Sequence, residues 1–299
     1  MVPSIRIRDN VRLGANDYMI KIKGVEVARG EAYADQFLAM DSGAVTGKIE
    51  GIETHEPAFG LPAVWIPTGR KEQAEMMNFT VVDCSSVLAT HLTEIIKSHA
   101  AELLSRQDLN SLLDTVKQRS PAVVEEVVGG TLKAGDIQKI LQGLLEERVS
   151  IRDLETILET LGDWGERTKD LEVLTEYVRN ALARTICSQY RSDEGQLRCV
   201  TLDPGLEDLI NRHIERGDRG SFLTLPPALA TGVIRAVSDQ LNKLIELGHS
   251  PVVLGSPQIR LSLRKLLAPT ILNVAVLAYN EIVKGVDIES VGMAVMETA

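Results

Sequence analysis

The chain has 299 residues, of which 32 are Lys or Arg and 42 are Asp or Glu, so its formal net charge is −10 at pH 7. This acid excess argues against a nucleic-acid-binding protein whose affinity comes from neutralising phosphates. The apolar stretches fall short of the roughly 18 residues that a membrane-spanning helix needs. Three widely spaced cysteines form neither a disulfide framework nor a metal-binding pair, which fits a reducing cytoplasm.

The first hundred residues combine strand and helix patterns. Isoleucine and arginine alternate over residues 5–8, and a second alternation runs over residues 18–23 up to Gly24, so a β-rich segment with a hairpin is predicted. Apolar residues then recur at helical spacing between Ser85 and His99. Because the β-rich segment has no helix of its own, we expect this later helix to cover its open face.

Between these patterns, residues 34–83 are rich in glycine and proline and contain only short apolar runs. They predict a small β domain with one helical turn over residues 71–77, inserted into a discontinuous first domain. Within it, residues 56–66 form an apolar stretch whose backbone is fixed by two prolines and a glycine. Either Phe59, Val64 and Trp65 belong to the core of the small domain, or part of the stretch is an exposed apolar patch that binds another protein. Composition favours neither interpretation.

The remaining two thirds of the chain predict a helical bundle followed by an α/β domain. Ser150 is the expected N-cap of one helix and Gly162 its expected end. From residue 197 onward, short apolar runs alternate with helical segments, which indicates a mainly parallel sheet. The fold class is therefore a multidomain mixture of α/β and α+β. Helical spacing places the bundle helices over residues 108–119, 121–128, 136–147, 151–162 and 170–186.

Short motifs that could carry chemistry are weak in this sequence. Residues 43–49 resemble a phosphate-binding loop, but the spacer is one residue short and Ile49 replaces the hydroxyl that would hold Mg²⁺. Residues 255–256 lie between a predicted strand and helix, where an anion could bind, although an ordinary turn is the better interpretation. His91 and His99 lie too far apart on one helix to share a metal ion. We therefore expect no catalytic residue, no metal and no cofactor, with a nucleotide-binding α/β enzyme as the weaker alternative.

Several longer motifs follow one another along the chain. The run Glu56-Pro57-Ala58-Phe59-Gly60-Leu61 is the most distinctive of them. Together these motifs resemble the cytoplasmic domain of the type III secretion export-gate family, in its flagellar branch. The resemblance covers nearly the whole chain and is weaker after Ser192. The other motifs lie at residues 5–10, 20–30, 81–83, 85–87, 89–92, 141–145, 150–153, 156–161 and 174–179.

The resemblance implies four domains. Residues 1–34 and 84–105 would form the discontinuous first domain, residues 35–83 the inserted small domain, residues 106–190 the helical domain and residues 191–299 the C-terminal α/β domain. It also implies that a membrane domain, and the first strand and helix of the first domain, precede Met1 in the full protein. On this expectation the chain is the cytoplasmic portion of an inner-membrane protein and reaches the membrane only through the missing part.

The resemblance further implies a function without catalysis. The chain would bind export chaperones that carry their substrates, take part in the switch between substrate classes, contact other components of the export apparatus and assemble into a nine-membered ring. The injectisome branch of the family remains an alternative. By motif, the chaperone-binding dimple between the first two domains maps onto Met40, Phe59 and Thr90, with Glu56 beside it.

Overall fold

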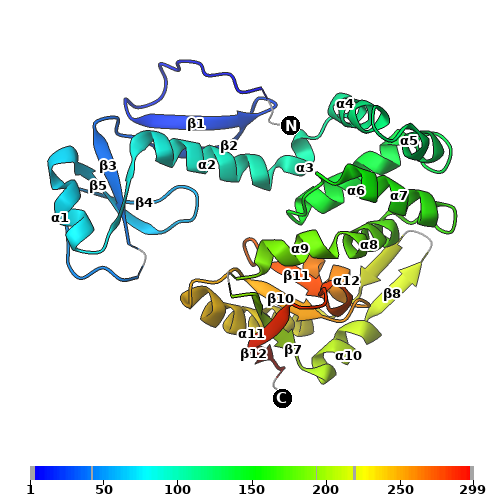
Figure 1. Ribbon diagram of the computed structural model, residues 1–299. Helices are drawn as coiled ribbons and strands as arrows, with labels where there is room; N and C mark the ends of the chain where they lie inside the picture. Colours follow the sequence, from blue (N-terminus) through cyan, green and yellow to red (C-terminus); the bar gives the residue numbers. More distant parts are fainter. Residues whose placement is uncertain (1–3, 42, 193, 218–219, 297–299) are drawn as a thin grey trace. The chain divides into compact units, whose positions relative to one another are not determined.

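The computed structural model describes residues 4–41, 43–192, 194–217 and 220–296. The chain forms two compact units, Met1–Ser105 (unit 1) and Arg106–Ala299 (unit 2), each with its own secondary structure (Figure 1). The predicted mixture of α/β and α+β structure is confirmed, because unit 1 holds antiparallel sheets and unit 2 holds helices and a parallel sheet. No helix among the described residues is long and apolar enough to cross a membrane.

Unit 1 begins with an antiparallel hairpin of β1 (Asp17–Ile22) and β2 (Val25–Glu31). Lys23 and Gly24 both have positive φ angles, 49° and 86°, as a two-residue hairpin turn requires. The strand predicted over residues 5–8 is wrong, since residues 5–10 form no regular structure and the Ile7 side chain is 92% exposed. No strand in the described part of the chain pairs with this segment, and alternation alone does not stabilise an unpaired strand.

A four-stranded antiparallel sheet follows in unit 1, with the strand order β4-β5-β3-β6. Because neighbouring side chains in a strand point to opposite faces, Leu38 packs on one face of this sheet and Ala39 on the other. Ala74 of the short helix α1 covers the Ala39 face, and Val87 covers the Leu38 face. The elements are β3 (Gln36–Met40), β4 (Ile52–His55), β5 (Pro62–Pro67), η1 (Thr68–Arg70), α1 (Lys71–Met76) and β6 (Thr80–Asp83).

The long helix α2 (Cys84–Ser98) begins directly after β6, and the short helix α3 (Ala100–Leu103) follows it. The Asp83 carboxylate accepts a hydrogen bond from the Ser86 amide at 3.0 Å and caps the first turn of α2. One side of α2 is buried through Val87 and His91, which are four residues apart and therefore lie on the same helix face.

Six helices form the first part of unit 2. Asp153, not Ser150, caps α7, since its carboxylate accepts from the Thr156 amide at 3.3 Å. The helix also continues past Gly162, which packs closely against Val127 and so serves helix packing rather than termination. The helices are α4 (Arg106–Lys117), α5 (Pro121–Val127), α6 (Ala134–Glu146), α7 (Leu154–Gly165), α8 (Leu171–Ala181) and α9 (Ala183–Tyr190).

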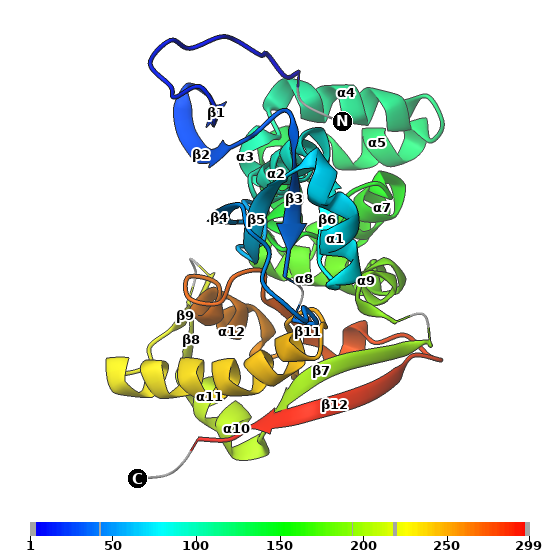
Figure 2. The ribbon, with the colours of Figure 1, turned by 90° about the vertical axis from the view of Figure 1, so that its left-hand side faces the viewer.

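The C-terminal part of unit 2 is built on a four-stranded sheet in the order β11-β10-β7-β12, and all of its pairs are parallel. This confirms the predicted parallel sheet, although the edge strand β12 was not predicted. Figure 2 shows β12 alongside β7, with α11 crossing near them. The elements are β7 (Gln196–Leu202), α10 (Pro204–Arg212), β8 (Ile214–Gly217), β9 (Gly220–Leu223), α11 (Pro227–Glu246), β10 (Val252–Gly255), α12 (Arg260–Leu267), β11 (Ala275–Ala278), η2 (Tyr279–Glu281) and β12 (Asp287–Ala294).

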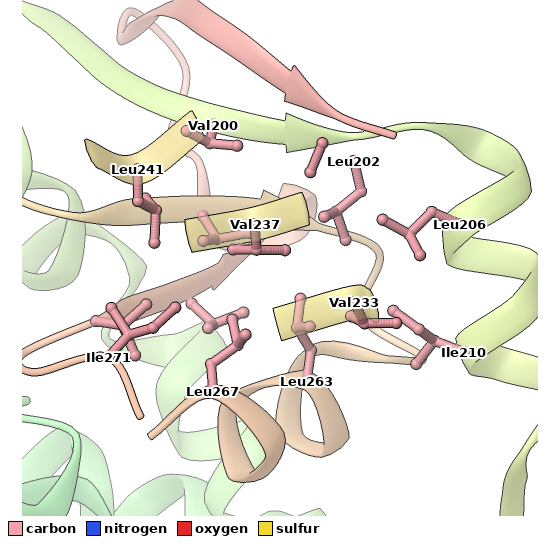
Figure 3. Packing of buried hydrophobic residues seen from close by; sticks show 14 of the residues in the cluster. Val200, Leu202, Leu206, Ile210, Val233, Val237, Leu241, Leu263, Leu267 and Ile271 are labelled. Atoms are coloured by element: carbon pink, nitrogen blue, oxygen red, sulfur yellow. The ribbon is translucent and has the colours of Figure 1, made fainter. Parts of the chain in front are cut away.

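One face of the parallel sheet packs against helices in an aliphatic core. Val200 and Leu202 of β7 meet Val237 of α11 and Leu263 of α12, and each of these side chains is almost completely buried (Figure 3). The core contains no aromatic side chain among its buried members. This explains how a chain with only 4% aromatic residues builds a stable layer from Leu, Ile and Val.

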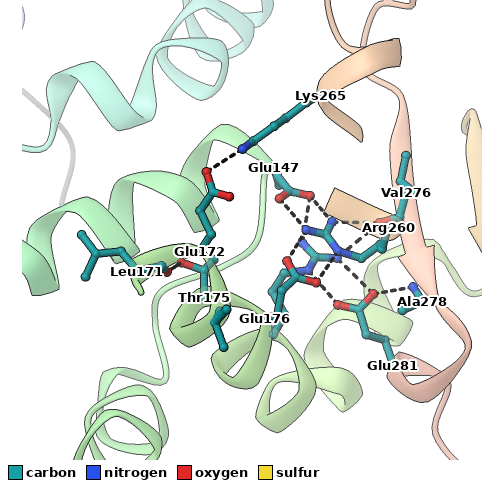
Figure 4. Close-up of polar contacts among 12 residues, drawn as sticks. Glu147, Leu171, Glu172, Thr175, Glu176, Arg260, Lys265, Val276, Ala278 and Glu281 are labelled. Carbon is teal, nitrogen blue, oxygen red and sulfur yellow. Dashed lines mark hydrogen bonds and ion pairs between the residues drawn. The ribbon is translucent and has the colours of Figure 1, made fainter. Parts of the chain in front are cut away.

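A cluster of buried charged side chains ties the helices of unit 2 to its parallel sheet. The guanidinium of Arg260, at the start of α12, donates to both oxygens of Glu147 at 2.6 and 3.1 Å and, through Nε, to Glu176 at 2.6 Å (Figure 4). Arg179 of α8 donates to Glu281 at 2.7 Å and to Glu147 at 3.2 Å. The partners are up to 113 residues apart in the sequence, so the cluster joins elements that form far apart along the chain.

Every charge in this cluster has an opposite partner. Burial alone would raise the pKa of Glu147, but Arg179 and Arg260 outweigh burial and lower it, so this carboxylate remains ionised. Burial raises the pKa of Glu176, although Arg260 opposes the shift. Removing one arginine would leave a largely buried carboxylate with less compensation for its charge.

We expect Arg260→Met to lower the free energy of unfolding of unit 2 by about 3 to 5 kcal/mol, because it removes the main cation of Glu176 and one of the two arginines that pair with Glu147. Urea unfolding of the whole chain measures this loss. Lys265→Met is the matched control, since Lys265 is half-exposed and pairs with the partly exposed Glu172, so its loss should stay below about 1 kcal/mol. Equal losses for the two variants would contradict the assigned role of the cluster.

Candidate functional site

The buried carboxylate of Glu56 accepts hydrogen bonds from the backbone of the loop between β4 and β5. Glu56, only 3% exposed, accepts the amide N–H of Ala58 at 3.0 Å and that of Phe59 at 2.6 Å. The Glu56 backbone closes the same loop, since its carbonyl accepts from Gly60 and its amide donates to Leu61, both at 2.8 Å. Gly60 has a φ of +73°, a conformation that favours glycine. Four hydrogen bonds therefore fix a six-residue loop.

Phe59 projects from this loop with 55% of its surface exposed. Trp65, by contrast, is 1% exposed and packs with Leu38, Ala63 and Val87. The interpretation in which both aromatic residues form the core is therefore wrong for Phe59 and correct for Trp65. Leu61, the last residue of the loop, is 38% exposed, so the apolar character of the surface extends beyond a single ring.

The other two residues of the predicted site, Met40 and Thr90, come from different elements. Met40 ends β3 and its half-buried side chain packs against the cluster that contains Trp65 and Val87. Thr90 is exposed on α2, three residues beyond Val87 and hence on a neighbouring part of the helix surface. Among the described residues, the only hydrogen bond that joins two of the four predicted residues runs from the Phe59 amide to the Glu56 carboxylate. Their role as one binding site stays a prediction.

Two further polar side chains of unit 1, Tyr18 and His91, contact each other, and neither is among the residues predicted for the site. The Tyr18 hydroxyl of β1 lies 2.6 Å from Nδ1 of His91 on α2, and the two rings meet edge to face with centroids 5.7 Å apart. Burial raises the pKa of Tyr18 to about 12, and the negative charge of Glu56 adds to this shift. Burial lowers the pKa of His91, while Glu56 opposes that shift. The one available sequence signal was the position of His91 four residues after Val87 on the apolar face of the helix.

The weaker chemical motifs are explained by local structure. At residues 255–256 the Ser256 amide donates to the Glu207 carboxylate at 3.0 Å, so a protein anion already occupies the position where a phosphate would bind. Residues 43–49 are not followed by a helix, and the Thr46 amide donates to the Met77 carbonyl at 3.1 Å. His99 lies at the end of α2 with Glu102 at 3.7 Å. In the described part of the chain no three His, Cys, Asp or Glu side chains form a group that could hold a metal ion.

The sequence matches the FHIPEP family model over residues 1–287. This chain belongs to the FHIPEP family. Among its relatives is the flagellar biosynthesis protein FlhA of Bacillus subtilis strain 168, which is 43% identical over 293 residues. The alignment covers 98% of this chain but 43% of the relative, so the chain spans less than half the length of that protein.

Solved structures of similar fold extend this family assignment. The Chlamydia pneumoniae CdsV protein is 27% identical, with a TM-score of 0.86 over 96% of this chain and 82% of CdsV. The nonameric EscV cytosolic domain from the type III secretion system is 25% identical, with a TM-score of 0.71 over 90% of this chain and 79% of EscV. The FHIPEP chain described here therefore shares its architecture with this cytosolic domain.

We expect the stability of unit 1 to fall as the pH drops below about 6.5, the ordinary pKa of histidine. Because burial lowers the pKa of His91 in the folded state, the unfolded chain binds more protons just below that pH, and acid therefore favours unfolding. Urea unfolding at pH 7, 6 and 5 should show a smaller loss of stability for His91→Asn than for the wild type. Thr93→Ala replaces an exposed residue on the same helix and should lose stability with falling pH as the wild type does. If His91→Asn also loses as much stability between pH 7 and 5 as the wild type, the prediction is refuted.

Proposed function

We propose that this chain is the cytoplasmic docking platform of a flagellar type III protein export gate, and that it binds export chaperones carrying their substrates. The observation that carries the proposal is the state of Phe59, whose ring is 55% exposed while its backbone amide is fixed by the buried Glu56 carboxylate. Family membership and the likeness to an export-system cytosolic domain support it. No cofactor, metal or catalytic residue enters this proposal.

An exposed aromatic ring on a rigid loop suits protein recognition. Aromatic side chains supply much of the energy of protein interfaces, because they bury a large area for few rotatable bonds. A loop that is already ordered loses little conformational entropy when a partner binds. Phe59 and Leu61 would supply the apolar anchors, Met40 an apolar wall and Thr90 a hydroxyl for hydrogen bonding. Glu56 would act indirectly by holding Phe59 in place.

The relatives favour the flagellar branch over the injectisome branch. The flagellar relative is 43% identical to this chain, whereas the CdsV and EscV structures are 27% and 25% identical. We infer that the complete protein continues into a membrane domain and is anchored in the inner membrane, with this portion on the cytoplasmic side. We also infer a nine-membered ring, as in the nonameric EscV domain. Switching between substrate classes would follow from different chaperone complexes competing for the ring.

We expect Phe59→Ala to weaken binding of a flagellar chaperone–substrate complex by about 10- to 30-fold, since it removes the exposed anchor of the site. Isothermal titration calorimetry with purified chain measures the affinity. The circular dichroism spectrum and the unfolding midpoint should stay unchanged, because the ring contributes little to the core.

Phe222→Ala is the matched control for this experiment. Phe222 lies on β9 in unit 2 and is 56% exposed, so the substitution removes an equally exposed ring far along the chain from the proposed site. It should leave the affinity unchanged. Wild-type affinity in Phe59→Ala, or equal losses in both variants, would show that Phe59 is not part of a specific docking site.

A further inference from the structure

We infer that the free edge of β4 takes up an extended segment of the docked partner, which joins the four-stranded sheet of unit 1 as a fifth strand. The inference rests on the proposed docking function and adds a mode of recognition to it, namely backbone pairing beside the apolar contact at Phe59. Strand β4 leads directly into the loop that carries Phe59, so both contacts lie on one continuous stretch of the chain.

Strand β4 lies at the edge of its sheet. The strand order is β4-β5-β3-β6, as Figure 2 shows, and β4 pairs with β5 on one side. No strand in the described part of the chain pairs with its other side. Three of the four β4 residues are exposed. Because an edge strand presents unpaired N–H and C=O groups, it can template the addition of another strand.

One hydrogen bond fixes the pairing pattern of β4 with β5. The Glu56 amide donates to the Leu61 carbonyl at 2.8 Å, so these two residues form a hydrogen-bonded pair one step beyond the pair of His55 and Pro62. Hydrogen-bonded and non-hydrogen-bonded pairs alternate in an antiparallel ladder, so His55 and Pro62 form a non-hydrogen-bonded pair. The Pro62 carbonyl agrees with this, because it accepts the Asp41 amide at 2.8 Å on the β3 side of β5.

The same alternation identifies the outward groups of β4. Ile52 and Thr54 bond to β5, and the N–H and C=O groups of Glu53 and His55 therefore point to the free edge. These four groups have no hydrogen-bond partner among the described residues. Their spacing suits an added strand, as in other cases of strand addition to a sheet edge. A helix would not satisfy them, because its own backbone groups are bonded internally.

The side chains of β4 define the sequence pattern expected of the partner. Ile52 lies opposite Trp65 and is 40% exposed, so it offers apolar surface on the sheet face that α2 covers. Glu53 and His55 point to the opposite face and are both exposed. A segment that alternates apolar and polar residues therefore fits beside β4. Its apolar residues would lie on the face against which Met40 also packs.

Amide hydrogen exchange on the whole chain, alone and bound to a flagellar chaperone–substrate complex, tests this inference. In the free chain the amides of Glu53 and His55 should exchange fast, whereas that of Thr54, which bonds to β5, should exchange slowly. In the complex the Glu53 and His55 amides should exchange about tenfold more slowly. The Leu38 amide in the core of β3 should keep its rate. Fast exchange of both edge amides in the complex would overturn the inference.

Glu53→Pro removes one outward N–H group. Proline is tolerated on an edge strand where the N–H faces solvent, so the sheet should stay folded, and slow exchange at Thr54 checks this. Glu53→Ala is the matched control, since it removes the same side chain but keeps the N–H. By calorimetry, Glu53→Pro should bind the complex about fivefold more weakly than Glu53→Ala does. Equal affinities of the two folded variants would overturn strand addition. If the proline variant does not fold, the exchange rates of the wild type decide.

The Phe59→Ala variant separates this inference from the proposed function. If it weakens binding while the Glu53 and His55 amides stay fast in the wild-type complex, docking at Phe59 is supported and strand addition is overturned. A wild-type chain that does not bind the complex overturns both. Sedimentation of the free chain tests the remaining occupant, because a dimer that is lost in Glu53→Pro would assign this edge to a second copy and overturn the inference.

Discussion

Presentation of Phe59 depends on one electrostatic constraint, the burial of the Glu56 carboxylate under the β4–β5 loop. Removing a carboxylate from water is costly, and the structure offsets that cost with short hydrogen bonds from the two amides that precede and carry the aromatic ring. The same bonds leave the loop backbone with little freedom. The backbone that carries Phe59 is therefore fixed by a buried acceptor, while the ring itself is 55% exposed.

The constraint holds only because the surrounding sheet is closed on both faces. Side chains of β3 alternate between two separate cores, and α1 closes one face while α2 closes the other. Helix α2 has a double role, since Val87 packs in the core and His91, one turn later, bonds to the Tyr18 hydroxyl of β1. A helix that follows the small sheet in sequence thus connects it to the β1–β2 hairpin that precedes it.

The sequence predicted those parts of the structure that depend on local rules. The prolines and glycine of residues 56–66 correctly indicated a rigid segment, and short apolar runs indicated the parallel sheet of unit 2. Whether Phe59 is buried could not be predicted, because exposure in a loop follows from tertiary packing and has no periodicity. The Tyr18–His91 pair could not be predicted either, since it joins residues 73 positions apart. Alternation over residues 5–8 predicted a strand wrongly, because a strand also needs a pairing partner. Strand β12 was not predicted, because it is largely exposed and lacks the apolar run that marks the inner strands.

The two units stabilise buried charge in different ways, and the difference bears on how each can move. In unit 1 the Glu56 carboxylate is satisfied by amides two and three residues away, so these bonds are local in the sequence. In unit 2 the arginines reach carboxylates 32 to 113 residues distant, and these bonds exist only while the helices and the parallel sheet stay together. Sliding one layer against the other would expose several unpaired charges at once. The buried ion pairs therefore join the helices of unit 2 to its parallel sheet, and we expect Arg106–Ala299 to move as one body.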